Sequence, residues 1–94
     1  MYVKTILHQN GKLIVGDKMI GKMLKYMRIK KGLNQQQLGK IVNISQQNLS
    51  RYEKNQRIIA FDTIEKIANN CGYKIYFEND EEKLQVKDIV RKVD

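Results

Sequence analysis

The stretch NQQQLGKIVNISQQNLSRYE, residues 34–53, decides the fold. Its apolar side chains have the spacing of two short amphipathic helices, residues 35–42 and 46–54. Asn34 and Ser45 precede these helices, and both residue types accept hydrogen bonds from the free N–H groups at a helix start. Asn43 follows the first helix and can adopt the left-handed conformation that ends one. The sequence therefore predicts two short helices joined by a tight turn.

Gly39 lies inside the first of these helices, where a glycine costs about 1 kcal/mol relative to alanine. A missing side chain lets the second helix cross closely, which gives that cost a structural reason. Two helices in this arrangement form a helix-turn-helix, a motif whose second helix enters the major groove of DNA. The exposed face of residues 46–54 is therefore the predicted reading surface.

That face carries amide side chains and one arginine. An amide presents a donor and an acceptor together, which matches the N6/N7 edge of adenine, and an arginine can pair with O6 and N7 of guanine. The predicted base contacts are Gln46, Gln47, Asn48 and Arg51. The predicted phosphate contacts lie at the helix starts and just beyond the second helix: Asn34, Gln35, Ser45, Lys54, Asn55 and Arg57. The alternative is a generic solvated helix. The cap, the turn, the glycine and the amide-rich face all favour the helix-turn-helix instead.

The flanking sequence predicts further elements. Apolar stripes predict one helix over residues 18–31 and another that begins at Ala60 or Asp62 and ends at Gly72. Shorter signals predict a β-hairpin over residues 2–15 with Asn10-Gly11 as a type I′ turn, an aromatic-rich strand over residues 73–78, and a short helical stripe beyond it. The predicted domains are an N-terminal hairpin, a helical domain, and a strand with an acidic tail, over residues 1–17, 18–72 and 73–94.

Length and charge fit one basic domain, with 94 residues and a formal net charge of +8. Residues 1–77 hold 14 Lys and Arg against four acids, whereas residues 78–94 hold four against six. An excess of cations favours a polyanionic partner such as nucleic acid. A lysine-rich surface that serves only solubility is the alternative.

Several classes of protein are excluded by what the sequence lacks. One cysteine, Cys71, and one histidine, His8, allow neither an internal disulfide framework nor a Cys/His zinc site. No apolar run approaches the ~20 residues of a membrane span, and the N-terminus has no secretion signal. No acid–base pair, glycine-rich phosphate loop or activated nucleophile is recognisable. We therefore expect a cytoplasmic protein that is not an enzyme, takes no metal or cofactor and contacts no membrane.

Residues 18–72 resemble the Cro/C1-type helix-turn-helix domain of the XRE regulators. The resemblance rests on LNQQQLG at 33–39 and SQQNLSRYE at 45–53, which are similar to the recognition unit of lambdoid phage repressors. It implies a mainly α, lambda-repressor-like helical domain. The predicted N-terminal β-hairpin is not part of the family's core domain, and a short β-strand is expected after the fourth helix. The family usually has glycine where Asn43 and Asn55 stand, and often has proline before the fourth helix, where this chain has none.

The resemblance also implies roles for single residues. Base contacts fall to Gln46, Gln47 and Arg51, and a phosphate contact to Gln35. The arginine of the first helix and the glutamate that ends the third form a structural ion pair in the family, here Arg28 and Glu53.

The expected function is sequence-specific binding of double-stranded DNA by a transcriptional repressor. Because one copy of such a domain buries little DNA surface, we expect a homodimer on a palindromic operator with half-sites about one helical turn apart. The alternative is an antitoxin that binds a toxin protein and regulates its own operon. Residues 72–78, a glycine followed by an apolar strand, resemble the segment that follows the fourth helix in HipB-type antitoxins. In those proteins the strand pairs with its copy in a second subunit. Here the predicted N-terminal hairpin is an alternative partner for the same edge of the strand over residues 73–78.

Overall fold

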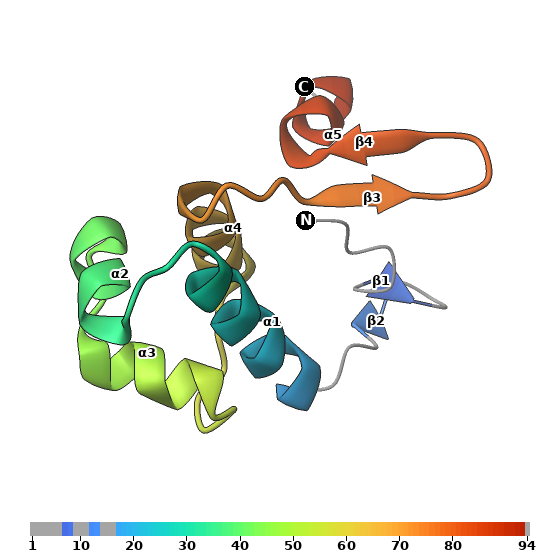
Figure 1. Cartoon of the computed structure of the whole chain (residues 1–94). Helices are drawn as coiled ribbons and strands as arrows, with labels where there is room; N and C mark the ends of the chain where they lie inside the picture. Colours follow the sequence, from blue (N-terminus) through green and yellow to red (C-terminus); the bar gives the residue numbers. More distant parts are fainter. Residues whose placement is uncertain (1–6, 9–11, 14–16, 94) are drawn as a thin grey trace.

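Figure 1 shows the chain as a computed structural model, which describes residues 7–8, 12–13 and 17–93. Four helices form the body: α1 (Asp17–Lys30), α2 (Gln35–Val42), α3 (Gln46–Glu53) and α4 (Phe61–Asn70). An arm follows them, made of β3 (Tyr76–Glu78), β4 (Lys83–Gln85) and α5 (Val86–Val93). The predicted mainly α fold is confirmed, and α2 and α3 begin at the predicted residues.

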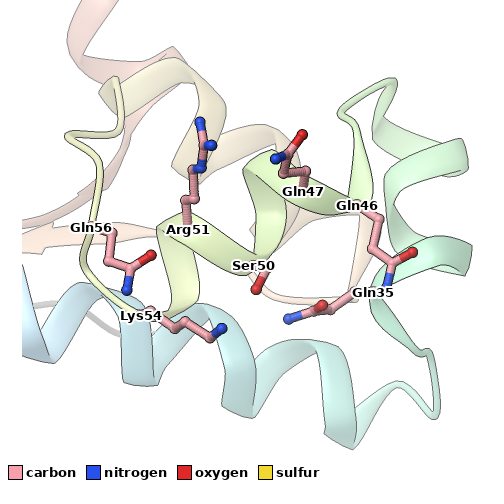
Figure 2. A pocket seen from close by; sticks show the side chains of 7 residues that line it. All are labelled: Gln35, Gln46, Gln47, Ser50, Arg51, Lys54 and Gln56. Carbon is pink, nitrogen blue, oxygen red and sulfur yellow. The ribbon is translucent and has the colours of Figure 1, made fainter.

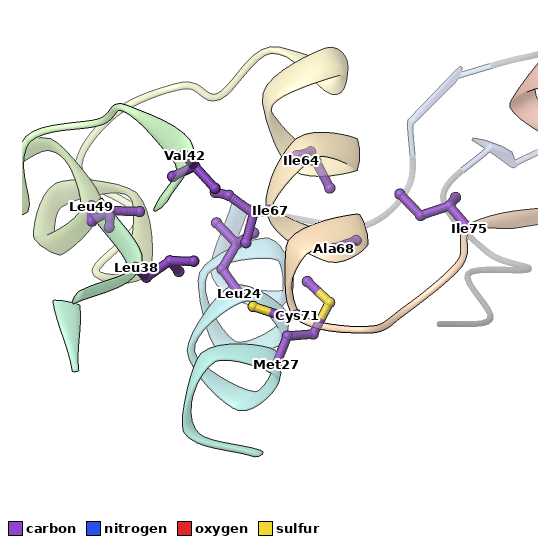
Figure 3. Packing of buried hydrophobic residues seen from close by; sticks show 10 residues of the cluster. All are labelled: Leu24, Met27, Leu38, Val42, Leu49, Ile64, Ile67, Ala68, Cys71 and Ile75. Carbon is purple, nitrogen blue, oxygen red and sulfur yellow. The ribbon is translucent and has the colours of Figure 1, made fainter. Parts of the chain in front are cut away.

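The hydrophobic core lies where the four body helices meet (Figure 3). Its buried apolar side chains are Leu24, Met27, Leu38, Val42, Leu49, Ile64, Ile67, Ala68, Cys71 and Ile75. A fully buried aliphatic side chain of this size stabilises the fold by about 1.5–3 kcal/mol, so the core fixes α2 and α3 against α1 and α4. The thiol of Cys71 is free and belongs to this core, and its burial raises the pKa of the thiol.

All four body helices end in the same hydrogen-bonded motif. In a Schellman motif the residue after the helix has a positive φ, and the next N–H donates to the carbonyl five positions back. The positive-φ residues are Gly32, Asn43, Asn55 and Gly72, with φ of 82°, 58°, 58° and 86°. The matching bonds join Leu33 to Arg28, Ile44 to Gly39, Gln56 to Arg51 and Tyr73 to Ala68, at 3.1, 2.9, 2.8 and 2.8 Å. The left-handed end predicted at Asn43 is therefore confirmed, and Asn55 has the same conformation after α3.

The arm differs from the prediction. The strand is shorter than residues 73–78, because β3 begins at Tyr76 and pairs antiparallel with β4, with Phe77 opposite Leu84. The sequence did not predict β4, and neither of the two expected partners of the strand is the one found here. Asn79 shapes the connection, since its Oδ1 accepts from the N–H groups of Glu81 and Glu82, both at 2.8 Å. An Asx turn of this kind lets a short hairpin form without a longer strand pattern.

The structure gives only a fragment of the predicted N-terminal hairpin. β1 (Leu7–His8) and β2 (Lys12–Leu13) pair antiparallel, with Leu7 opposite Leu13. This register leaves three residues between the strands, whereas a type I′ turn at Asn10-Gly11 would pair residue 9 with residue 12. The described pairs therefore do not fit the predicted type I′ turn. The rest of the hairpin lies outside the described residues and stays a prediction.

Candidate nucleic-acid interface

Side-chain caps fix the start of both α2 and α3. Asn34 Oδ1 accepts from the Gln37 N–H at 2.7 Å, and the Asn34 N–H donates back to Gln37 Oε1 at 2.8 Å. Ser45 Oγ accepts from the Asn48 N–H at 3.1 Å. These bonds satisfy N–H groups that the helices leave free. Both predicted caps are confirmed, and the side-chain oxygens of Asn34 and Ser45 are engaged in capping.

Gly39 is required by the turn that follows its own helix. A Cβ at this position would lie 2.4 Å from the backbone oxygen of Ile44, but 3.5 Å from the Leu49 side chain of α3. The closest obstacle is therefore the turn and not the second helix, which corrects the predicted reason for this glycine. The consequence is the same, since the short turn brings α3 against α2.

Gly21 marks a second close approach, which the sequence did not reveal. A Cβ on Gly21 would lie 2.5 Å from both the Glu53 backbone oxygen and Asn55 Oδ1. Asn55 Oδ1 accepts from the Gly21 N–H at 2.9 Å, and so ties α1 to the residue that ends α3. Glycine at position 55 would satisfy the left-handed backbone but could not make this bond. The structure thus supplies a reason for asparagine at this position.

A buried ion pair joins α1 to the end of α3. Arg28 Nε donates to Glu53 Oε2 at 2.7 Å and Nη2 donates to Oε1 at 2.9 Å, a bidentate arrangement. Nη1 donates to the Leu33 backbone oxygen at 2.8 Å. The two side chains are only 11% and 4% exposed, and the hydrogen bonds to Glu53 raise the pKa of Arg28. The expected ion pair of Arg28 with Glu53 is present.

Gln35 connects this pair to the surface. Its Nε2 donates to Glu53 Oε1 at 3.3 Å, while the residue itself is half-buried at the first position of α2. The amide nitrogen has a second hydrogen that this bond leaves available. Gln35 is thus held in place by its bond to the buried Glu53 carboxylate.

A shallow groove follows the exposed face of α3 (Figure 2). The lining side chains are amides, a hydroxyl and cations: Gln35, Gln46, Gln47, Ser50, Arg51, Lys54 and Gln56. Figure 2 shows Gln47 and Arg51, one helical turn apart, pointing to the same side. Every lining side chain is neutral or positively charged, so the groove suits an anionic, hydrogen-bonding surface.

The structure brings five of the ten predicted contacts to this groove. Gln46, Gln47, Arg51, Gln35 and Lys54 line it, together with two residues that the sequence did not single out as contacts, Ser50 and Gln56. The other five predicted contacts are engaged elsewhere. Asn34 and Ser45 cap α2 and α3. Asn55 binds α1, and Asn48 and Arg57 bind each other beside the groove. Ser50 follows from the helical spacing, whereas Gln56 reaches the groove through the Schellman turn.

Within residues 7–8, 12–13 and 17–93, no group of three or more His, Cys, Asp or Glu side chains is placed to hold a metal ion. Over the same residues, no helix has the length and apolar character needed to cross a membrane.

Comparison with known families gives the identity of the fold. The helix-turn-helix family model matches residues 24–77, which include α2, α3 and α4. The chain belongs to the helix-turn-helix family. It is of the XRE, Cro/C1 type.

Two known proteins illustrate the range of similarity. An uncharacterized HTH-type transcriptional regulator of Rickettsia conorii is 35% identical over 68 residues, which cover 70% of this chain and 54% of that protein. The chain thus spans about half the length of this curated relative. The crystal structure of the clp gene regulator ClgR from Corynebacterium glutamicum aligns with a TM-score of 0.58, covering 61% of each chain at 19% identity. At that identity the likeness shows a shared fold.

Proposed function

We propose that this protein is a sequence-specific, double-stranded DNA-binding transcriptional regulator of the repressor type, acting in the cytoplasm. The observation that carries the proposal is the groove on α3, whose lining combines amide readers with exposed cations and contains no carboxylate. Membership in the helix-turn-helix family and the printed name of the Rickettsia relative support the same function.

Base reading falls to the exposed side chains of α3. Gln46 and Gln47 open the helix, and their free amides can pair with the N6 and N7 atoms of adenine. Arg51 lies one turn beyond Gln47 and can bind O6 and N7 of guanine. The buried Arg28–Glu53 pair and the caps hold the backbone of α3 in place, so binding orders the reader side chains but not the helix itself.

Phosphate contacts fix the register of the helix on DNA. Gln35 keeps one amide hydrogen for a phosphate oxygen while the other remains on Glu53. Lys54 is exposed at the end of α3, and its charge adds attraction that depends on salt concentration.

Dimerisation through the arm would give two reading helices. Figure 1 shows β3, β4 and α5 on the opposite side of the body from α2 and α3, so a contact there leaves the groove open. In α5, Val90 is 49% exposed and Val93 80% exposed, which leaves part of an apolar stripe uncovered. A homodimer formed at this stripe would bind a palindromic operator.

The same uncovered stripe supports the alternative function of an antitoxin-type protein. In that case a toxin would cover α5, and the helix-turn-helix domain would regulate the shared operon. Light scattering of the purified chain, alone and mixed with the protein encoded beside it, tests both ideas. A stable mass of about twice 11.1 kDa for the chain alone supports the homodimer, and a stable complex with the neighbouring protein supports the alternative.

Selection of bound sequences from random duplex DNA, followed by a salt titration, tests DNA binding directly. A two-fold-symmetric motif is expected. Arg51→Ala should weaken binding to that motif and relax the preference at one base pair by about 1–3 kcal/mol. Lys74→Ala removes the same charge from the segment between α4 and β3 and is the matched control. Equal losses for both variants on every sequence would mean that the groove does not read bases.

A further inference from the structure

Two polar side chains beside the groove bind each other. Arg57 Nη1 donates to Asn48 Oδ1 at 3.2 Å. Asn48 is two residues from both Gln46 and Ser50, and residues with that separation point to different sides of a helix. Consistent with this, Gln46 and Ser50 line the groove and Asn48 does not. The amide oxygen of Asn48 therefore faces the loop after α3, at the edge of the base-reading surface beside Arg51.

Both partners stand on rigid backbone. The N–H of Asn48 is bonded to Ser45 Oγ at 3.1 Å, at the first turn of α3. The residue before Arg57 is fixed by the Schellman bond from its N–H to the Arg51 carbonyl at 2.8 Å. One position earlier, the Asn55 side chain is bonded to Gly21 of α1 at 2.9 Å. The fold therefore fixes the backbone at and beside these two residues, which keeps the Asn48 and Arg57 side chains within reach of each other.

We propose that Asn48 is a positioning residue, which holds the guanidinium of Arg57 toward the DNA backbone, and that it is not itself a base contact. The inference rests on the proposed function and revises one contact within it. Asn48 is a neutral acceptor, so it orients Arg57 without cancelling its charge, as a carboxylate would. The bond uses one of the five N–H donors of the guanidinium and leaves four for phosphate oxygens.

The test compares two amide deletions on α3 in the full chain. Binding is measured by fluorescence anisotropy to the selected duplex and to duplexes that each carry one base-pair change, over a range of salt concentrations. Asn48→Ala is expected to weaken binding about two- to tenfold on every duplex and to lower the salt slope by up to about one. Gln47→Ala, the matched amide deletion, is expected to lose affinity in a way that depends on one base pair.

A double variant identifies the route of the effect. If Asn48 acts through Arg57, then Asn48→Ala with Arg57→Ala binds like Arg57→Ala alone, because the positioned group is already gone. Asn48→Ala leaves the Ser45 cap intact, since that bond uses the backbone N–H. Arg57 is exposed, so its removal is expected to leave the melting temperature unchanged, and thermal melts check both variants.

Three results would overturn the assignment: unchanged binding by Asn48→Ala, a loss confined to one base pair, or a double variant whose loss is the product of the single losses. Failure of the proposed function would be seen separately. The unmodified protein would then select no motif, which overturns base reading as a whole together with this inference.

Discussion

Replacing Arg28 by methionine tests the buried pair that supports the reading helix. The substitution keeps an apolar stem but removes the two bonds to Glu53 and the bond to the Leu33 carbonyl. Glu53 is then left 4% exposed with Gln35 Nε2, at 3.3 Å, as its remaining side-chain partner in the described chain. Stranding one member of a buried pair costs about 3–5 kcal/mol. The slight exposure of this pair favours the lower end, so Arg28→Met is expected to cost about 3 kcal/mol.

Urea titration followed by circular dichroism measures this loss. An unchanged slope of the free energy of unfolding against urea concentration would show that the unfolded state is the same. For a domain of this size, the melting temperature should fall by roughly 12–24 °C. The paired change Arg28→Met with Glu53→Leu removes both charges and is expected to recover most of the loss. A single variant within about 1 kcal/mol of the parent, or a paired variant no better than the single one, would refute the reasoning.

Three further predictions concern the scaffold. Alanine at Gly21 or Gly39 should lower the free energy of unfolding by about 1–3 kcal/mol, because its Cβ would lie 2.5 or 2.4 Å from a backbone oxygen; a stabilised variant in urea titration would contradict this. Asn34→Ala removes the capping box of α2 and should cost about 1 kcal/mol, so an unchanged thermal midpoint would speak against the cap. Burial raises the pKa of Cys71 above its usual 9.0, so the unfolded thiol ionises first and stability falls as the pH rises above that value. Urea midpoints at about pH 8 and about pH 10 should therefore diverge more in the parent than in Cys71→Ala, and equal changes would exclude the effect.

The helix-turn-helix could be predicted from sequence because its signals are local. The cap residues Asn34 and Ser45, the left-handed Asn43 and the apolar spacing all act within a few positions of one another. Each therefore leaves a pattern that a single sequence displays. The Arg28–Glu53 pair is a long-range contact, and it was expected only through the resemblance to a known family.

The features that were missed depend on contacts between distant segments. In the sequence, Gly21 is only a residue of low helix propensity, and the need for glycine there comes from the close approach of the end of α3. Asn55 can be predicted to end a helix, but its bond to α1 cannot. β4 has three residues and exists because β3 offers it a partner. Its strongest local signal is Asn79, whose side chain folds the connection back.

The predicted DNA contacts also differ in whether local spacing or contact between segments determines them. Helical spacing alone places Gln46, Gln47 and Arg51 on one surface, and they do line one groove. Residue type alone assigned Asn48 and Arg57 to DNA, but side-chain pairing between α3 and the following loop determines what they bind in the free protein. Such pairing depends on the loop conformation, which residue type does not reveal.

Mapping the DNA-binding surface residue by residue tests the central claim most directly. The isotopically labelled chain would be titrated with its selected duplex, and changes in backbone amide chemical shifts would be followed by nuclear magnetic resonance. The account predicts that the largest changes occur in α3, at the start of α2 and in the loop through Arg57. Largest changes in β3, β4 and α5, with α3 unaffected, would contradict it and move the functional surface to the arm.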